Sequence, residues 1–110
     1  MEIQSFKDLP LSMEVLRSIE ELGFENLFPI QAQAIMPLLE GKDVIGQAQT
    51  GTGKTAAFGV PMVERLNPET QKVQGLVLVP TRELAVQVAE ELKRLARYRS
   101  DVQIVPVYGG

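Results

Sequence analysis

Apolar side chains recur at helical spacing in the N-terminal part of the chain. Leu16, Ile19 and Leu22 fall on one face of a predicted helix over 13–22, and Ser12 is positioned to cap its N-terminus. A glycine directly after the helix is typical of a C-terminal stop. The N-terminal part of the chain is therefore predicted to be helical.

A second helix is predicted to start at Pro29, because proline is favoured in the first turn of a helix. Its pattern continues to Met36. Pro37 is expected to kink or end this helix, and Gly41 is expected to be its final stop.

Beyond Gly41 the pattern changes to short apolar runs separated by helical stretches. The runs cover 43–47, 75–79 and 102–108, and the middle one is nearly continuous, as in a parallel strand covered on both faces. One helix is predicted between the first two runs and extends to about Leu66, with a bend at Pro61.

The last predicted helix follows the second run. Thr81 can cap it, and its apolar stripe consists of Leu84, Val88, Leu92 and Leu95. The alternation of strands and helices predicts an α/β fold: a parallel sheet with right-handed crossovers, flanked by helices.

Composition narrows the possible chemistry. The 110 residues are 45% hydrophobic and 23% charged, as in an ordinary globular protein, and there is no cysteine or histidine. Disulfides, zinc sites and Ser/His or Cys/His nucleophile pairs are therefore excluded. Carboxylate side chains and a bound magnesium ion remain as the groups that could take part in chemistry. The net charge of −3 argues against nucleic-acid binding by bulk charge, so any such contact should be local. No apolar run is long enough to span a membrane, and we expect a cytoplasmic protein.

The strongest chemical signal lies between the run at 43–47 and the helix that follows it. The segment reads Ala48, Gln49, Thr50, Gly51, Thr52, Gly53, Lys54 and Thr55. It matches the phosphate-binding pattern G-x-x-x-x-G-K-[ST] except that Ala48 holds the first glycine position. The glycines let successive N–H groups converge on phosphate oxygens at a helix N-terminus. Lys54 is then placed to meet the outer phosphates, and Thr55 to ligate Mg²⁺. The alternative is a chance Gly-Lys-Thr in a surface turn.

Together with this loop, three further segments resemble DEAD-box RNA helicases, in the same order and spacing. The Q motif of that family is matched by Gly23-Phe24 and Pro29-Ile30-Gln31, with Phe6 upstream. Pro80-Thr81-Arg82-Glu83-Leu84-Ala85 resembles motif Ia, and Gly109-Gly110 resembles the GG element. The chain departs from the family at Phe28, where threonine or serine is usual.

The resemblance implies an ATP site formed by the Q motif and the phosphate loop. A glutamine amide can pair with N6 and N7 of adenine, so Gln31 is expected to select ATP. Phe6 is expected to stack on adenine, with Phe24 also in the site. The alternatives are that Phe6 packs on nearby leucines and that Gln31 is a solvated helical residue.

The resemblance also implies a site for RNA backbone. Thr81 and the N–H groups that begin its helix face the end of the sheet where ligands of α/β folds gather, next to Pro80. Arg82 can add a charge-assisted bond to phosphate, or instead pair with an acidic neighbour. Gly109 and Gly110 would allow close approach of the backbone, or form a plain turn. The implied partners are ATP with Mg²⁺, single-stranded or short duplex RNA, and a second RecA-like domain.

The resemblance makes 1–110 the N-terminal portion of a helicase ATP-binding, RecA-like domain. Residues 1–41 form its Q-motif helical region and 42–110 its phosphate-loop α/β region. The sequence contains no Asp-Glu-Ala-Asp run, so we expect no catalytic residue in this segment, no ATP turnover by it alone and an incomplete sheet. Two other functions stay open, namely a superfamily-2 DNA helicase fragment and a non-catalytic nucleotide-binding module.

Overall fold

The computed structural model describes residues 4–48, 53–99 and 101–109. A short 3-10 helix, η1 (Phe6–Asp8), precedes four α-helices. They are α1 (Met13–Glu21), α2 (Pro29–Leu39), α3 (Lys54–Arg65) and α4 (Arg82–Leu95). All four predicted helices are therefore present, in the predicted order.

The helix ends follow the local sequence. The hydroxyl of Ser12 accepts a hydrogen bond from the N–H of Val15, and that of Thr81 accepts one from Leu84, so each residue caps its helix. The end of α2 agrees with the prediction: the helix passes Pro37 and continues to Leu39, and Gly41 follows with φ +85°. A proline removes only one N–H donor, and the packing of α2 against α3 outweighs that loss.

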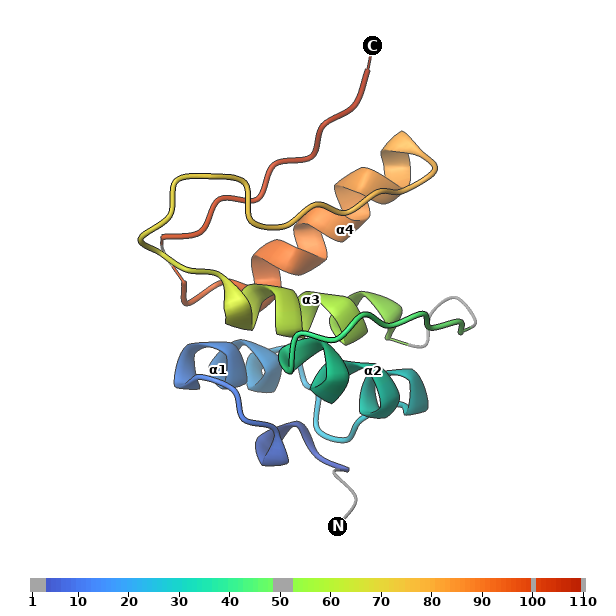
Figure 1. Cartoon of the computed structure of the whole chain (residues 1–110), viewed down its shortest axis with the longest axis vertical. Helices are drawn as coiled ribbons and strands as arrows, with labels where there is room; N and C mark the ends of the chain where they lie inside the picture. Colours follow the sequence, from blue (N-terminus) through green and yellow to red (C-terminus); the bar gives the residue numbers. More distant parts are fainter. Residues whose placement is uncertain (1–3, 49–52, 100, 110) are drawn as a thin grey trace.

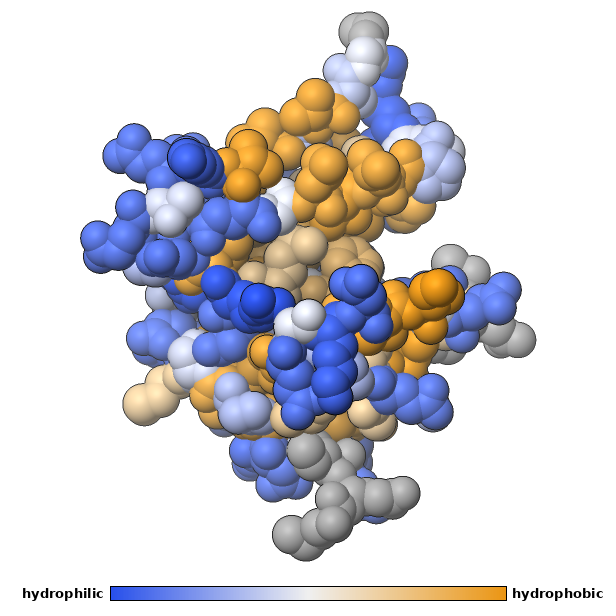
Figure 2. All heavy atoms as spheres, in the orientation of Figure 1, coloured by the Kyte–Doolittle hydropathy of each residue, from blue (hydrophilic) through white to orange (hydrophobic). Residues whose placement is uncertain are grey.

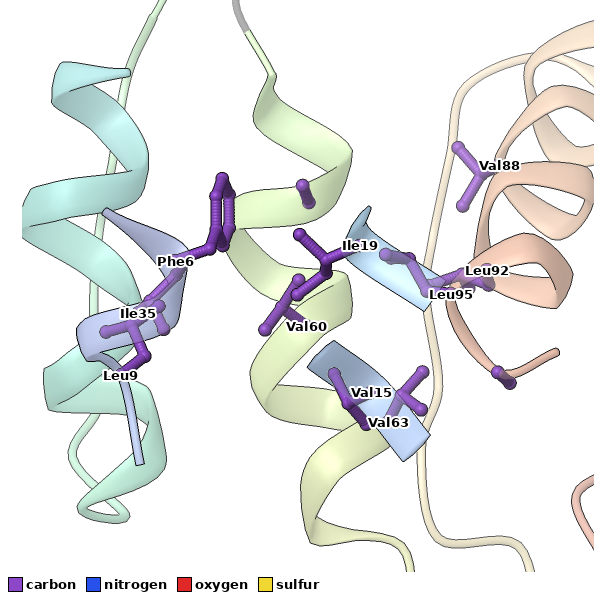
Figure 3. Packing of buried hydrophobic residues seen from close by; sticks show 12 residues of the cluster. Phe6, Leu9, Val15, Ile19, Ile35, Val60, Val63, Val88, Leu92 and Leu95 are labelled. Atoms are coloured by element: carbon purple, nitrogen blue, oxygen red, sulfur yellow. The ribbon is translucent and has the colours of Figure 1, made fainter. Parts of the chain in front are cut away.

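The core is built around α3, which lies between α2 and α1 on one side and α4 on the other (Figure 1). Figure 3 shows Val60 and Val63 of α3 facing side chains from η1, α1, α2 and α4. The fully buried positions include Val15, Ile19 and Ile35. Burial of such side chains contributes about 1.5–3 kcal/mol each, which makes this cluster the main source of stability.

A polar contact joins α1 to the chain just after α4. The hydroxyl of Tyr98 donates to the carboxylate of Glu21, and this hydrogen bond raises the pKa of Tyr98 above its ordinary value. Arg17 stacks on the Tyr98 ring with 4.2 Å between the guanidinium carbon and the ring centre. These exposed contacts link α1 to the segment that follows α4.

The three predicted strands are not paired in the structure. The runs 43–47, 75–79 and 102–108 are irregular segments, and the only bridge among the described residues joins Ser5 to Asn26. A strand is stable only when its N–H and C=O groups pair with a neighbouring segment, and these three runs do not pair with one another.

Two of these segments nevertheless keep the alternation of a strand. Within 75–79, Val77 and Val79 pack on the core, whereas Leu76 and Leu78 are 75% and 86% exposed. The same alternation runs through 102–107. Figure 2 shows the resulting apolar surface on the upper part of the molecule, where these segments run.

Candidate functional site

The first turns of α2 and α3 meet on one side of the molecule (Figure 1), and Gln31 joins them. Its Nε2 donates to the carbonyl oxygen of Gly53 over 3.2 Å, and its Oε1 accepts from the N–H of Phe28 over 2.9 Å. Gln31 is only 1% exposed. Its amide therefore has a partner at each end, as a buried amide requires, and it connects the Q-motif segment to the start of α3.

Gly53 is held in a conformation that only glycine adopts easily. Its φ is +81°, and a Cβ at this position would collide with the side chain of Gln31. The residue serves as the N-cap of α3. The tight turn expected at the end of a phosphate loop is thus present at this glycine.

The predicted phosphate and magnesium ligands begin α3. Lys54 is exposed and Thr55 is half-buried in the first turn, where the free N–H groups of a helix favour an anion. Ala48 is half-buried. Four other predicted ATP-binding residues lie outside the described residues, namely Gln49, Thr50, Gly51 and Thr52.

The described residues fit a magnesium ion that arrives with its nucleotide. No cluster of three acidic side chains suited to a metal occurs in the described part of the chain. Mg²⁺ commonly takes few protein ligands and completes its shell with water and phosphate oxygens. A single hydroxyl such as that of Thr55 matches this mode of binding.

Phe6 and Phe24 lie beside each other, but only one is accessible. Phe6 is 2% exposed and belongs to the core with Leu9, whereas Phe24 is 37% exposed. Their ring centres are 5.9 Å apart with 25° between the planes. In this structure Phe6 packs with Leu9 in the core, as in the packing alternative considered above, and its stacking on adenine stays a prediction.

The predicted RNA-contact residues come together at the start of α4. The guanidinium of Arg82 donates to the carbonyl oxygen of Gly109 and lies 5.1 Å from the centre of the Tyr108 ring. Thr81 caps the helix, and Pro80 before it is exposed. Gly110 lies outside the described residues. Because a guanidinium carries five N–H donors, the bond to Gly109 leaves others for a phosphate.

Figure 1 shows the first turns of α3 and α4 on the same side of the molecule. The candidate nucleotide residues and the candidate RNA residues therefore share one side of the fold. Sequence reasoning noted Phe28 only as a departure from the family and did not place it beside Gly53, and it missed Tyr108, whose ring lies next to the Arg82 guanidinium. The available signal for Tyr108 was an aromatic residue directly before a matched motif.

Comparison with known proteins identifies the class first. The fold superimposes on a DEAD box protein from the hyperthermophile Methanococcus jannaschii with a TM-score of 0.81 and 40% identity, covering 86% of this chain and 26% of that one. A hypothetical ATP-dependent RNA helicase from Sulfolobus tokodaii gives 0.72 and 37%, covering 82% and 25%. The fold is thus that of part of a RecA-like helicase domain, which confirms the predicted fold class although its strands are unpaired here.

The family follows from sequence. The profile of the DEAD/DEAH box helicases matches residues 28–110, and the chain belongs to this family. It is 56% identical to the DEAD-box ATP-dependent RNA helicase CshA of Geobacillus kaustophilus over 106 residues, which is 96% of this chain and 22% of that protein. For CshA of Bacillus subtilis the identity is 53% over 106 residues, with 96% and 21% covered. The chain spans about a fifth of the length of these relatives. None of its described helices is long and apolar enough to cross a membrane.

Proposed function

We propose that this chain is the N-terminal, nucleotide-binding part of an ATP-dependent RNA helicase. The observation that carries the proposal is the contact of buried Gln31 with Gly53, which brings the Q-motif segment against the start of α3. A nucleotide with its phosphates at Lys54 would then have its base near α2. The similarity to CshA, named an ATP-dependent RNA helicase, supports the same function.

In this proposal the start of α3 binds the phosphates of ATP. Lys54 supplies positive charge, and the backbone N–H groups of the first turn donate hydrogen bonds to the phosphate oxygens. Thr55 contributes its hydroxyl to the Mg²⁺ that accompanies ATP. Phe24 lines the site as an accessible ring.

Selection of adenine is assigned to Gln31. Each end of the amide makes one hydrogen bond here and can make a second, because Nε2 carries two N–H donors and Oε1 two lone pairs. Pairing with N6 and N7 of adenine would therefore keep both bonds, and it requires that the base reach a side chain that is 1% exposed.

RNA backbone is assigned to the start of α4. Thr81 and Arg82 with Gly109 form a local site of N–H donors and positive charge, which suits a protein with net charge −3. Such contacts carry no base information. A second RecA-like domain would supply the remaining surface, and the acidic residues for hydrolysis are not among these 110 residues.

The test is nucleotide titration of the protein at its full natural length, with Lys54→Ala as the variant. Loss of the ammonium should nearly abolish ATP binding while circular dichroism stays unchanged. Equal affinity of both proteins would place the phosphates elsewhere. Stimulation of ATP turnover by RNA and by DNA separates an RNA helicase from a DNA helicase, and a protein that binds ATP without turning it over would be a binding module. The cytoplasmic location stays a prediction, which cell fractionation tests.

A further inference from the structure

The end of the chain brings an aromatic ring to the first turn of α4. Val102 and Ile104 pack against the core, and because side chains of an extended segment alternate between two sides, Tyr108 continues on their side. The core no longer covers this position, and Tyr108 is 53% exposed. The guanidinium of Arg82 lies over its ring instead, with 5.1 Å between the guanidinium carbon and the ring centre.

The described partners of the Arg82 guanidinium are both uncharged. It donates to the carbonyl oxygen of Gly109 and lies over the Tyr108 ring. None of the ion pairs formed within the described part of the chain includes Arg82. A carbonyl and a phenol ring attract the guanidinium without neutralising it, as a carboxylate would. The positive charge therefore stays available to a phosphate.

The side chain of Arg82 lies next to the backbone groups that are assigned to phosphate. Side chains of a helix lean toward its N-terminus, which is also where the N–H groups of the first turn point. The hydroxyl of Thr81 accepts the N–H of Leu84, and the N–H groups before it have no partner within the helix. An anion at this end of α4 would meet these N–H groups and the guanidinium together.

An exposed arginine side chain samples many rotamers, and binding a phosphate fixes one of them. The contacts with Tyr108 and Gly109 limit this freedom before a phosphate binds, so less entropy is lost on binding. A ring face suits this purpose, because its π electrons attract a cation and its plane stacks on the flat guanidinium. Gly109 contributes only its backbone carbonyl, so Tyr108 is the side chain that mutation can test.

We propose that Tyr108 is a positioning residue for the RNA backbone: its ring holds the Arg82 guanidinium in place at the start of α4. This inference rests on the proposed function, in which Arg82 binds a phosphate. The ring acts through the arginine, so its effect should disappear when Arg82 is removed. The effect should also be equal for RNA oligomers of unrelated sequence, because a phosphate carries no base information.

The experiment measures the affinity of the full-length protein for two unrelated RNA oligomers by fluorescence anisotropy. Tyr108→Ala should weaken both about two- to fivefold, the usual effect of removing an exposed cation–π contact. Tyr108→Phe keeps the ring and should bind like the wild type, whereas Tyr108→Leu keeps only apolar bulk and should lose as much as Tyr108→Ala. Unchanged ATP affinity shows that each variant is folded.

Two further variants separate positioning from other roles. In the Arg82→Ala background, Tyr108→Ala should cause no further loss, whereas direct stacking of the ring on RNA would give the same loss in both backgrounds. Tyr98→Ala is the matched control. The Tyr98 ring also lies against an arginine, 4.2 Å from the guanidinium carbon of Arg17, but it follows the other end of α4. This variant should leave RNA affinity unchanged.

A loss that persists in the Arg82→Ala background would overturn the inference. So would wild-type RNA affinity of Tyr108→Ala or Tyr108→Leu, a loss in Tyr108→Phe equal to that in Tyr108→Ala, or an equal loss in Tyr98→Ala. The RNA site would still stand in these cases if Arg82→Ala alone weakens RNA binding. Unchanged RNA affinity of Arg82→Ala, or a wild type that binds no RNA, would refute the proposed site at the start of α4 and this inference with it.

Discussion

Replacing Gln31 by alanine should destabilise the protein as well as weaken nucleotide binding. The change removes the acceptor of the Phe28 N–H and the donor to the Gly53 carbonyl, two hydrogen bonds of 2.9 and 3.2 Å made by a side chain that is 1% exposed. Each such bond contributes about 0.5–1.5 kcal/mol, and a buried group left without a partner costs about 1–3 kcal/mol.

The sum for this site is about 2–4 kcal/mol. We take the carbonyl of Gly53 as the larger contribution, because Phe28 is half-exposed and water can reach its N–H once the glutamine is gone. Against a typical domain stability of about 5–15 kcal/mol, the loss is large enough to measure in a urea titration. Gln31→Glu keeps an acceptor for Phe28 but replaces the donor to Gly53 by a buried carboxylate oxygen that faces the Gly53 carbonyl, so it should destabilise the protein more than Gln31→Ala does.

The same contact predicts the pattern of ligand binding. If Gln31 positions the start of α3, Gln31→Ala should weaken tripolyphosphate as well as ATP. The loss should be larger for ATP by about 1–3 kcal/mol, the contribution of a bidentate amide–adenine pair. Calorimetric titration of both ligands measures the two losses separately. Unchanged stability together with unchanged tripolyphosphate binding would refute the positioning role.

Three other predictions concern the remaining contacts. Arg82→Ala should weaken the binding of unrelated RNA oligomers equally and reduce the salt dependence of RNA affinity by about one phosphate contact. Fluorescence anisotropy that shows a loss for one sequence alone would contradict this. Arg99 donates to two carbonyl oxygens at the end of α3 over 2.9 and 2.8 Å. Arg99→Ala should therefore lower the free energy of unfolding by about 2–4 kcal/mol. A urea midpoint within error of the wild type would show these bonds to be dispensable. The 110-residue chain alone should self-associate through 75–79 and 102–108, and a monomeric mass by light scattering would contradict that expectation.

The helices could be predicted because their signals are local. A capping hydroxyl such as that of Thr81 acts on the N–H three residues later, and an apolar stripe needs only the spacing of one segment. Three of the four stripe residues of α4 are buried, whereas Leu84 stays 36% exposed at the first turn. The prediction loses accuracy where the helix extends beyond the core.

The site could be predicted only as a set of motifs. The sequence indicates that Gln31 and Gly53 belong to one binding site, but not that the amide of one is bonded to the carbonyl of the other. That bond depends on how α2 packs on α3, which is a property of the whole core. For the same reason, the sequence allowed Phe6 either to pack on nearby leucines or to stack on adenine and could not predict that it is buried.

The apolar runs at 75–79 and 102–107 show most clearly what the sequence of one segment cannot predict. Side chains along 75–79 and 102–107 alternate between the core and the solvent, because successive side chains of any extended backbone point to opposite sides. This feature needs no second segment and can be predicted locally. Pairing is not such a property, because every ladder bond needs a second segment at the right distance and register. The described residues provide an inner face for both segments, in the core around α3, but no neighbour for their edges. Leu78 and Val107 are each 86% exposed, so the outer faces lack a cover as well. Residues 75–79 therefore have the side-chain pattern of a strand buried on both faces, and one packed face is not enough to make either segment a strand.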